Sequence, residues 1–263
     1  MTALFHCMQN DGPVLLNFPH SGIFLPPKIA NSLNQRGNML PDTDWHVPKL
    51  YGFAKEQVSW LEATHSRYVV DLNRDPDGAN LYPGQAGTDI CPVTDFAGAD
   101  IYREQQMPDI KARTEQYFRP YHTELSAQIE RILSRHGVCI LLDCHSILGQ
   151  VPRLFDGQLP DLNLGTFSGA SCDTSLAELA ATTLQTPEFP FVRDGRFTGG
   201  WITRQYGQPS SGVHALQLEI AQSCYMDENQ IELFDLETAA PLQRVLRNLI
   251  NNLNNWNINT RKQ

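Results

Sequence analysis

The feature that most restricts the fold is an uninterrupted apolar run that follows a long amphipathic segment. Across residues 109–136 the apolar side chains recur at helical spacing, and Gly137 supplies a natural helix stop. Pro120 is expected to kink or divide this helix. The next residues, 138–142, are all apolar. A strand in which no polar residues alternate with the apolar ones is typical of a largely parallel sheet covered on both faces. The segment therefore predicts a helix followed by a buried strand.

The same alternation of strand-like and helical patterns runs through the rest of the chain. Apolar runs predict strands at 14–18, 68–72 and 215–220, and helical spacing predicts helices at 44–56, 174–184 and 240–253. Residues 75–100 are rich in glycine, proline and aspartate and predict a long functional loop. We therefore expect an α/β fold, with a mixed, mostly parallel sheet flanked by helices on both faces. Without a repeat, linker or composition break, residues 1–263 are expected to form a single domain.

Composition and charge exclude several classes of protein. Hydrophobic residues make up 41% of the chain and charged residues 19%, as in ordinary globular proteins. A formal net charge of −9 argues against binding to nucleic acid or to an anionic membrane. No secretory signal precedes the first strand and no run approaches the roughly 18 apolar residues of a membrane span, which predicts a cytoplasmic protein. The six cysteines contain no CxxC pair, so neither a zinc ribbon nor a disulfide framework is expected.

Histidines follow two of the predicted strands. His20 comes after the run at 14–18, while Asp143 and His145 come after the run at 138–142. In open α/β sheets the ligand site lies beyond the carboxyl ends of the strands. Asp143 and His145 are two positions apart and point the same way on a strand, as a carboxylate that orients a metal-binding imidazole would. The alternative is that Asp143 caps a turn and His145 is solvated, but the match with His20 favours a metal centre.

A third ligand is needed, because a hydrolytic zinc site has three protein ligands and an open position for water. Asp44 and His46, in the segment TDWH, are the candidates. Asp44 has an alternative role as the N-cap of the helix expected at 44–56. We expect His20, Asp44 and His145 to hold one divalent metal ion, with His46 as the alternative third ligand. Zinc suits this donor set, although cobalt, manganese and iron share the same ligands.

A glutamate lies inside the strand predicted at 215–220. Glu219 is costly to bury among apolar residues unless a metal ion or an arginine stabilises it. Gln217 is on the same side of the strand and could assist. These features make Glu219 the candidate general base.

Three arginines accompany strand ends or glycine-rich segments, where an anionic ligand would bind. Asn73 and Arg74 close the segment VDLNR and are suited to holding a carboxylate. Arg103 follows an apolar pair, and Arg204 comes shortly after Gly200, where glycine lets the backbone approach a ligand or turn tightly. Each arginine alone is more often a surface charge. Together they predict an anion pocket for a small dianionic substrate.

The combined motifs resemble those of the N-formylglutamate amidohydrolase family. They are, in chain order, PHSG, TDWHV, VDLNRDPDGANLYPG, IYRE, LLDCHS, GRFTGGWITRQYG and HALQLEI, and they extend from about residue 14 to 220. The resemblance is to the histidine-degradation branch, chiefly through TDWHV and GRFTGGWITR. It implies hydrolysis of N-formyl-L-glutamate to formate and L-glutamate, the last step of a histidine-degradation route. It also implies the mixed sheet flanked by helices of zinc carboxypeptidases and aspartoacylases.

The resemblance further implies roles for individual residues. His145 matches the later histidine ligand, Glu219 the catalytic glutamate, and the pair Asn73–Arg74 the group that holds a terminal carboxylate. Arg74 is expected to be catalytic together with Glu219, since an arginine near the metal could also stabilise the oxyanion. Arg204 or Arg103 would then hold the side-chain carboxylate. The chain lacks the HxxE pattern of carboxypeptidases, since Ser21, Gly22 and Ile23 follow His20. This departure leaves the carboxylate ligand open, with Asp44 as the candidate.

Three other functions compete with this interpretation. The nearest is a related metal-dependent deacylase or carboxypeptidase that acts on another N-acyl amino acid. A structural zinc site is disfavoured because such sites are usually closed by four ligands and rich in thiolates. A serine hydrolase using Ser21 or Ser146 is disfavoured because the chain has no GxSxG elbow. None of these features indicates an oligomeric state.

Overall fold

The computed structural model describes residues 2–79 and 89–256, and within them the strands form one seven-stranded sheet with the order β1-β3-β2-β4-β7-β5-β6. Strands β3, β2, β4 and β7 are parallel to one another, whereas β1 and β5 are antiparallel to their neighbours β3 and β7. The predicted mixed, mostly parallel sheet is therefore confirmed. The strands are β1 (Phe5–Met8), β2 (Val14–Phe18), β3 (Ser59–Ala63), β4 (Cys139–Ile147), β5 (Leu162–Gly165), β6 (Phe191–Arg193) and β7 (Val213–Ala221).

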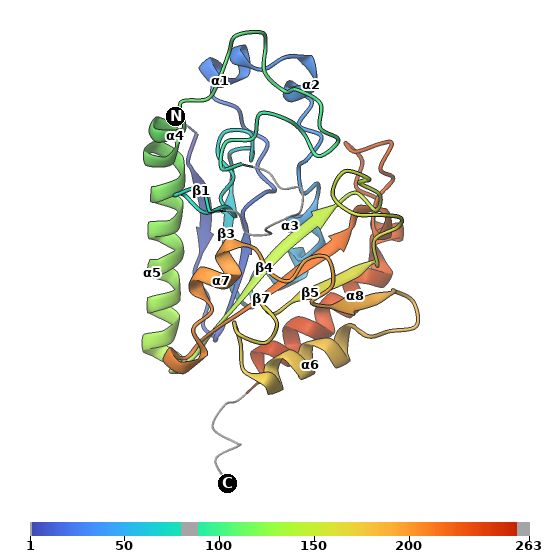
Figure 1. Ribbon diagram of the computed structural model, residues 1–263. Coiled ribbons are helices and arrows are strands. Elements are labelled where there is room, and N and C mark those ends of the chain that lie inside the picture. Colours follow the sequence, from blue (N-terminus) through green and yellow to red (C-terminus); the bar gives the residue numbers. More distant parts are fainter. Residues whose placement is uncertain (1, 80–88, 257–263) are drawn as a thin grey trace.

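Helices cover both faces of this sheet, as Figure 1 shows, with α5 on one side and α6 and α8 on the other. The short helices α1 and α2 lie beyond the end of the sheet to which β4 and β7 point (Figure 1). The α-helices are α1 (Pro27–Ser32), α2 (Gln35–Asn38), α3 (Val47–Leu50), α4 (Ile110–Arg113), α5 (Arg119–His136), α6 (Thr174–Leu184), α7 (Trp201–Tyr206) and α8 (Leu236–Asn254). Single-turn elements are η1 (Gly52–Ala54), the π-helix η2 (Thr114–Phe118), η3 (Pro209–Ser211) and η4 (Gln222–Cys224).

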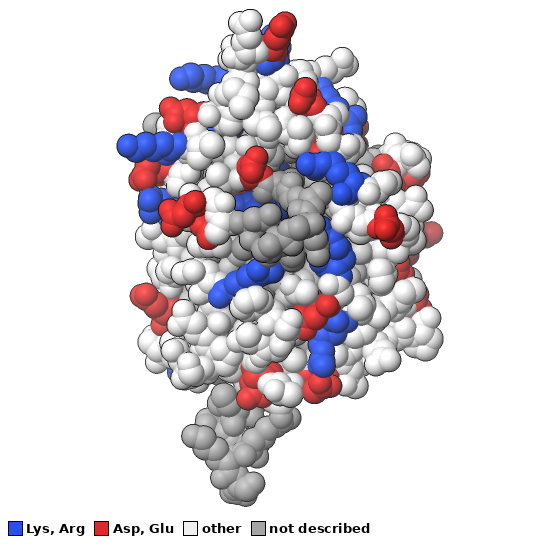
Figure 2. All heavy atoms as spheres, viewed as in Figure 1, with Lys and Arg blue, Asp and Glu red and all other residues white. Residues whose placement is uncertain are grey.

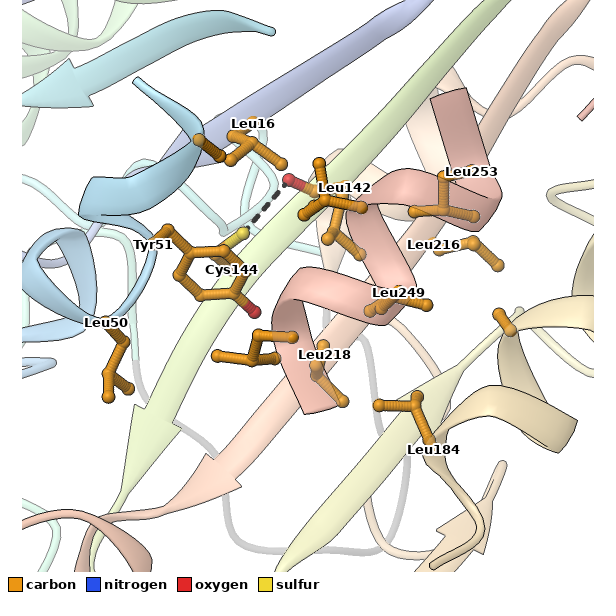
Figure 3. Packing of buried hydrophobic residues seen from close by; sticks show 14 of the residues in the cluster. Leu16, Leu50, Tyr51, Leu142, Cys144, Leu184, Leu216, Leu218, Leu249 and Leu253 are labelled. Atoms are coloured by element: carbon orange, nitrogen blue, oxygen red, sulfur yellow. Dashed lines mark hydrogen bonds between the residues drawn. The ribbon is translucent and has the colours of Figure 1, made fainter. Parts of the chain in front are cut away.

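One face of the sheet packs mainly on apolar side chains. Leu142 of β4 and Leu218 of β7 are fully buried here against Leu249 of α8. Figure 3 shows this layer, in which Tyr51 lies over Cys144 and the Cys144 thiol donates to the Leu142 carbonyl at 3.4 Å. Leucine side chains that interdigitate across a sheet and a helix give a close-packed layer, which holds the central strands rigidly.

On the opposite face, the side chains change from apolar to polar along the strands. Near the start of each strand, Leu15, Leu141 and Ala215 form an apolar row under α5. Two residues further on, the strand register brings Asn17, Asp143 and Gln217 into one row, and the next row contains His145 and Glu219. Neighbours in register on parallel strands point to the same side of the sheet, so the polar side chains converge at the carboxyl ends of β2, β4 and β7.

The helix predicted at 109–136 is divided into three elements. Helix α4 ends at Arg113, the π-helix η2 follows, and α5 begins at Arg119 with Pro120 in its first turn. Proline lacks the N–H that a continuous α-helix would need there, so the division at Pro120 agrees with the sequence prediction. Gly137 ends α5 in the left-handed conformation at φ 70°, which glycine adopts without steric cost.

One prediction from an apolar pattern was wrong. The run at 68–72 is a buried irregular segment, in which the Val69 N–H donates to the Ser66 carbonyl and the Asp71 N–H to the Ile90 carbonyl. Neither Ser66 nor Ile90 belongs to a strand, so no β-ladder forms. The strand that does border β2 is β3, whose apolar pattern was not singled out. The segment 44–56 does contain helical turns, as expected, and these are α3 and η1.

Residues 75–79 and 89–100 contain no helix or strand beyond one isolated bridge, as expected for the long loop. The motif letters NLYPG within that loop, at 80–84, lie outside the described residues. Among the described helices, none combines the length and the apolar character that crossing a bilayer requires.

Candidate active site

Three side chains converge where β2 and β4 end. His20, Asp44 and His145 each offer one ligand atom, and these atoms all lie within 4.8 Å of one another. The Asp44 Oδ2 atom lies 3.1 Å from His145 Nδ1 and 3.8 Å from His20 Nδ1. All three residues are buried. Two imidazole nitrogens and a carboxylate at such spacing form a donor set that can hold a divalent metal ion.

Backbone contacts fix Asp44 between the two strand ends. Its N–H donates to the His20 carbonyl at 3.1 Å, and its Oδ2 atom accepts the Ser146 N–H at 3.2 Å. The alternative role as a helix N-cap is not observed, because the N-cap position of α3 is occupied by His46. The carboxylate of Asp44 is instead turned toward His145.

A second carboxylate contacts the Nε2 atom of each histidine. His20 Nε2 lies 2.7 Å from Asp71 Oδ1, and His145 Nε2 lies 2.8 Å from Asp143 Oδ2. Because a carboxylate accepts a hydrogen bond, these contacts place a proton on each Nε2 and direct each Nδ1 toward Asp44. The prediction that Asp143 orients His145 is confirmed by this contact. Such carboxylate–histidine pairs are typical of metal ligands.

The two histidines differ in charge because their surroundings differ. The Arg67 guanidinium contacts Asp71 at 2.5 Å and lies 4.0 Å from Asp44. Burial, followed by the charge of Arg67, lowers the pKa of His20. Burial acts in the same direction on His145, but Asp143 and Asp44 outweigh it and raise the His145 pKa well above its ordinary value. The site without metal therefore carries a proton on His145, a positive charge that a bound metal ion would replace.

Glu219 faces this cluster from the neighbouring strand. It pairs in register with His145 across β4 and β7, and its Oε2 atom accepts the Gln217 Nε2–H at 3.2 Å. Burial raises its pKa to about 7, with His145 and Arg67 opposing the rise and Asp44 and Asp143 adding to it. A carboxyl group that titrates near neutrality can both accept and return a proton under physiological conditions.

An open pocket lies in front of these groups, and it holds about 580 Å³ of empty space, part of which is open solvent. Phe96, Ile147, Leu154 and Phe197 supply apolar surface, and Arg67, Arg74 and Arg196 supply positive charge. Figure 2 shows basic side chains gathered in the middle of the face that contains the ends of β4 and β7. The pocket is therefore suited to a small anion, despite the net charge of −9.

The sequence model of a family described as N-formylglutamate amidohydrolase matches residues 12–226, which include every residue of this pocket. The chain belongs to the N-formylglutamate amidohydrolase family. Two relatives are named N-formylglutamate deformylase. The protein from Pseudomonas putida is 43% identical over 257 residues, covering 96% of this chain and 95% of that protein. The protein from Pseudomonas aeruginosa is 44% identical over 249 residues, covering 93% of each chain.

Solved structures agree with this membership. The crystal structure of N-formylglutamate amidohydrolase from Ralstonia eutropha JMP134 matches with a TM-score of 0.79 at 25% identity, over 96% of each chain. A gene product of Agrobacterium tumefaciens matches with a TM-score of 0.69 at 17% identity, covering 95% of this chain and 96% of that one. The second likeness concerns the fold alone.

Several predicted site residues of this amidohydrolase lie elsewhere. His46 is half-buried, and its Nε2 atom lies 2.8 Å from the Ile231 carbonyl, outside the group formed by His20, Asp44 and His145. Arg103 is exposed, donates to the Leu33 carbonyl and does not line the pocket. Arg204 is also absent from the pocket lining, and its guanidinium donates to the Gly199 carbonyl and lies 4.8 Å from the Phe167 ring. The structure therefore separates these three side chains from the predicted centre.

Asn73 and Gly200 line the pocket together. The Asn73 amide donates to Asp143 Oδ2 at 3.1 Å and accepts the Ile202 N–H at 2.7 Å. These bonds favour a supporting role for Asn73 over direct binding of a carboxylate. A Cβ atom at Gly200 would lie 2.5 Å from Asn73 Nδ2, so glycine is needed here for close packing of α7 against Asn73.

The sequence interpretation missed Arg67, Asp71 and Arg196. Arg67 and Asp71 are four residues apart within the run at 68–72 and its flank, whose apolar pattern predicts a strand. The segment is a turn, and this geometry brings both side chains under His20. Arg196 belongs to GRFTGG, a motif that carried the family resemblance, and its adjacent glycines were a signal that could have identified it.

Proposed function

We propose that this chain hydrolyses N-formyl-L-glutamate to formate and L-glutamate in a metal-dependent reaction, which completes a histidine-degradation route. The observation that carries the proposal is the buried group of His20, Asp44 and His145 facing Glu219 at the base of a basic pocket. Relatives that are 43% and 44% identical over nearly the whole chain and named N-formylglutamate deformylase support the same substrate.

The donor set fits a divalent metal ion. Two imidazoles and one carboxylate, with space beside them in the pocket, suit zinc. Asp71 and Asp143 complete the fit by holding the Nε2 atoms, so that both Nδ1 atoms face the same point. When bound there, such an ion would polarise the formyl carbonyl and lower the pKa of a coordinated water.

Glu219 is the proposed general base. Its carboxylate would take a proton from the attacking water and later deliver it to the amine nitrogen of glutamate as the C–N bond breaks. Burial keeps the pKa of Glu219 near 7, so proton uptake and return are both favourable near neutral pH. Gln217 donates to Oε2 and leaves the other oxygen of Glu219 for the reaction.

The arginines of the pocket are proposed to bind the two carboxylates and the developing oxyanion. Arg74 and Arg196 come from separate segments of the lining, and we assign the α-carboxylate of the substrate to Arg74 and its side-chain carboxylate to Arg196. Arg67 lies 4.0 Å from Asp44, and no hydrogen-bond partner of its buried Nε occurs among the described residues. That position suits Arg67 to stabilise negative charge on the formyl oxygen.

The assignment of Arg196 predicts a change in specificity. Arg196→Met should lower kcat/KM for N-formylglutamate about 10- to 100-fold, because a charge-assisted hydrogen bond is worth roughly 1.5–3 kcal/mol. The same variant should change kcat/KM for N-formylglutamine much less, since that substrate lacks the side-chain carboxylate. Arg103→Met is the matched control, because Arg103 is exposed and outside the pocket. Equal losses for both substrates would contradict the assignment.

The whole proposal is tested by measuring metal content and formate release from N-formylglutamate before and after chelation. We expect about one divalent ion per chain, loss of turnover after chelation and recovery when Zn²⁺ is restored. A panel of formyl, acetyl and succinyl derivatives of glutamate and aspartate separates this function from that of a related deacylase. Protein that contains no metal and releases no formate would overturn the proposal.

A further inference from the structure

A chain of buried hydrogen bonds leads from the candidate metal centre to helix α5. Asp143 receives a hydrogen bond on Oδ1 from the Asn17 amide at 2.7 Å, and Asn17 Oδ1 in turn accepts the Tyr121 hydroxyl at 2.7 Å. All three side chains are at most 1% exposed. None of the steps assigned to the reaction uses Asn17 or Tyr121, and neither residue lines the pocket.

The donor and acceptor roles in this series of hydrogen bonds follow from the chemistry of its groups. An ionised carboxylate can only accept hydrogen bonds, so Asn17 must turn its NH₂ group toward Asp143. The amide oxygen then faces Tyr121, whose hydroxyl must act as the donor. Burial raises the pKa of Tyr121 well above its ordinary value, so the phenol keeps the proton that it donates. A flipped amide would place an oxygen against the carboxylate, and the Tyr121 hydroxyl therefore selects one orientation of Asn17.

The series of hydrogen bonds ends at Asp143, which in turn contacts His145. With Oδ1 occupied by Asn17, the Oδ2 atom of Asp143 accepts from His145 Nε2 at 2.8 Å and from Asn73 at 3.1 Å. This arrangement keeps the proton of His145 on Nε2 and directs Nδ1 toward Asp44. A carboxylate free to rotate would hold the imidazole less firmly.

We propose that Tyr121 and Asn17 are positioning residues, which act through Asp143 to orient His145 and so strengthen metal binding. This inference rests on the metal centre proposed above. The carboxylate partner of His20 is held differently, because Asp71 is bound by the charged side chain of Arg67 and by the Asn73 N–H. A salt bridge therefore contributes to the orientation of His20, whereas the side-chain hydrogen bonds that lead to Tyr121 are neutral.

The test is the affinity of the full-length protein for Zn²⁺, measured by competition with a chromophoric chelator. Tyr121→Phe removes only the hydroxyl, and it should raise the Zn²⁺ dissociation constant about 10-fold, at the lower end of the 10- to 100-fold cost of losing an outer partner of a ligand. The visible spectrum of the Co²⁺-loaded variant should shift, because His145 is less well oriented. Tyr206→Phe is the control, since its hydroxyl contacts His122 at 2.9 Å rather than Asn17.

A second variant shows whether the two residues act as a unit. Asn17→Leu should weaken Zn²⁺ binding at least as much as Tyr121→Phe, and the double variant should lose no more than Asn17→Leu alone, because Tyr121 acts only through Asn17. Additive losses, or unchanged Zn²⁺ affinity and Co²⁺ spectrum in folded Tyr121→Phe, would overturn the positioning role while leaving the proposed function intact. Parent protein that binds no divalent metal would instead overturn both.

Discussion

Replacing Glu219 with glutamine is expected to reduce kcat for formate release from N-formylglutamate by about 10²- to 10⁴-fold, the usual contribution of a general base. Glutamine has nearly the same size and can still accept the Gln217 hydrogen bond, so the pocket should keep its shape. It cannot take a proton from water. Metal content should remain at the parent level, because Glu219 is not one of the three grouped donors.

Glu62→Gln provides the matched control for this substitution. Glu62 lies on β3 and does not line the pocket, so the same chemical change there should leave kcat unaffected. Near-normal turnover by metal-loaded Glu219→Gln would show that another group moves the proton. Loss of metal together with activity would instead place Glu219 among the ligands.

The same variant has a second readout in the stability of the metal-free protein. Burial raises the pKa of Glu219 from 4.5 in the unfolded chain to about 7, so folding favours the protonated form. Below pH 4.5 the carboxyl is protonated in both states and contributes nothing; between pH 4.5 and 7 the parent protein loses stability as the pH rises. Glu219→Gln escapes this loss, and its advantage in the free energy of unfolding should reach about 3 kcal/mol above pH 7. Urea titrations at pH 5 and pH 8 measure the difference.

The site was predicted best where a local apolar pattern also determines the direction in which the side chains point. The run at 138–142 had to be a buried strand, and the period of two placed Asp143 and His145 on one side of its continuation. The structure extends this strand through Ile147 and pairs it with β7. Glu219 then lies beside His145, a neighbourhood that depends on the order of the strands and that no local pattern could establish.

The arginines show why the rest could not be predicted. The residues that flank Arg103 and Arg204 predict an anion site, but both guanidinium groups donate to nearby backbone carbonyls. Arg67 and Asp71 support the site from a turn whose apolar letters had predicted a strand. Whether an arginine faces a pocket depends on the path of its loop over the sheet, and loop conformation is set by contacts distant in sequence.

Replacing Asp44 with asparagine is expected to weaken metal binding strongly, because Asp44 rather than His46 is the proposed third ligand. Asp44→Asn keeps the size of the side chain and its ability to accept the Ser146 N–H, but it removes the negative charge between His20 and His145. We expect its Zn²⁺ dissociation constant to rise by at least about 100-fold, beyond the range for outer partners of ligands. Formate release should be lost at Zn²⁺ concentrations that saturate the parent protein.

His46→Asn is the matched comparison for Asp44→Asn. His46 has a φ of 61°, a left-handed conformation that asparagine tolerates better than most residues, so the backbone of the segment should be preserved. The variant loses the contact with the Ile231 carbonyl, but every donor near His20 and His145 remains. Zn²⁺ affinity and formate release should therefore stay within a few-fold of the parent. Metal loss in His46→Asn with retention in Asp44→Asn would reverse the assignment and make His46 the third ligand.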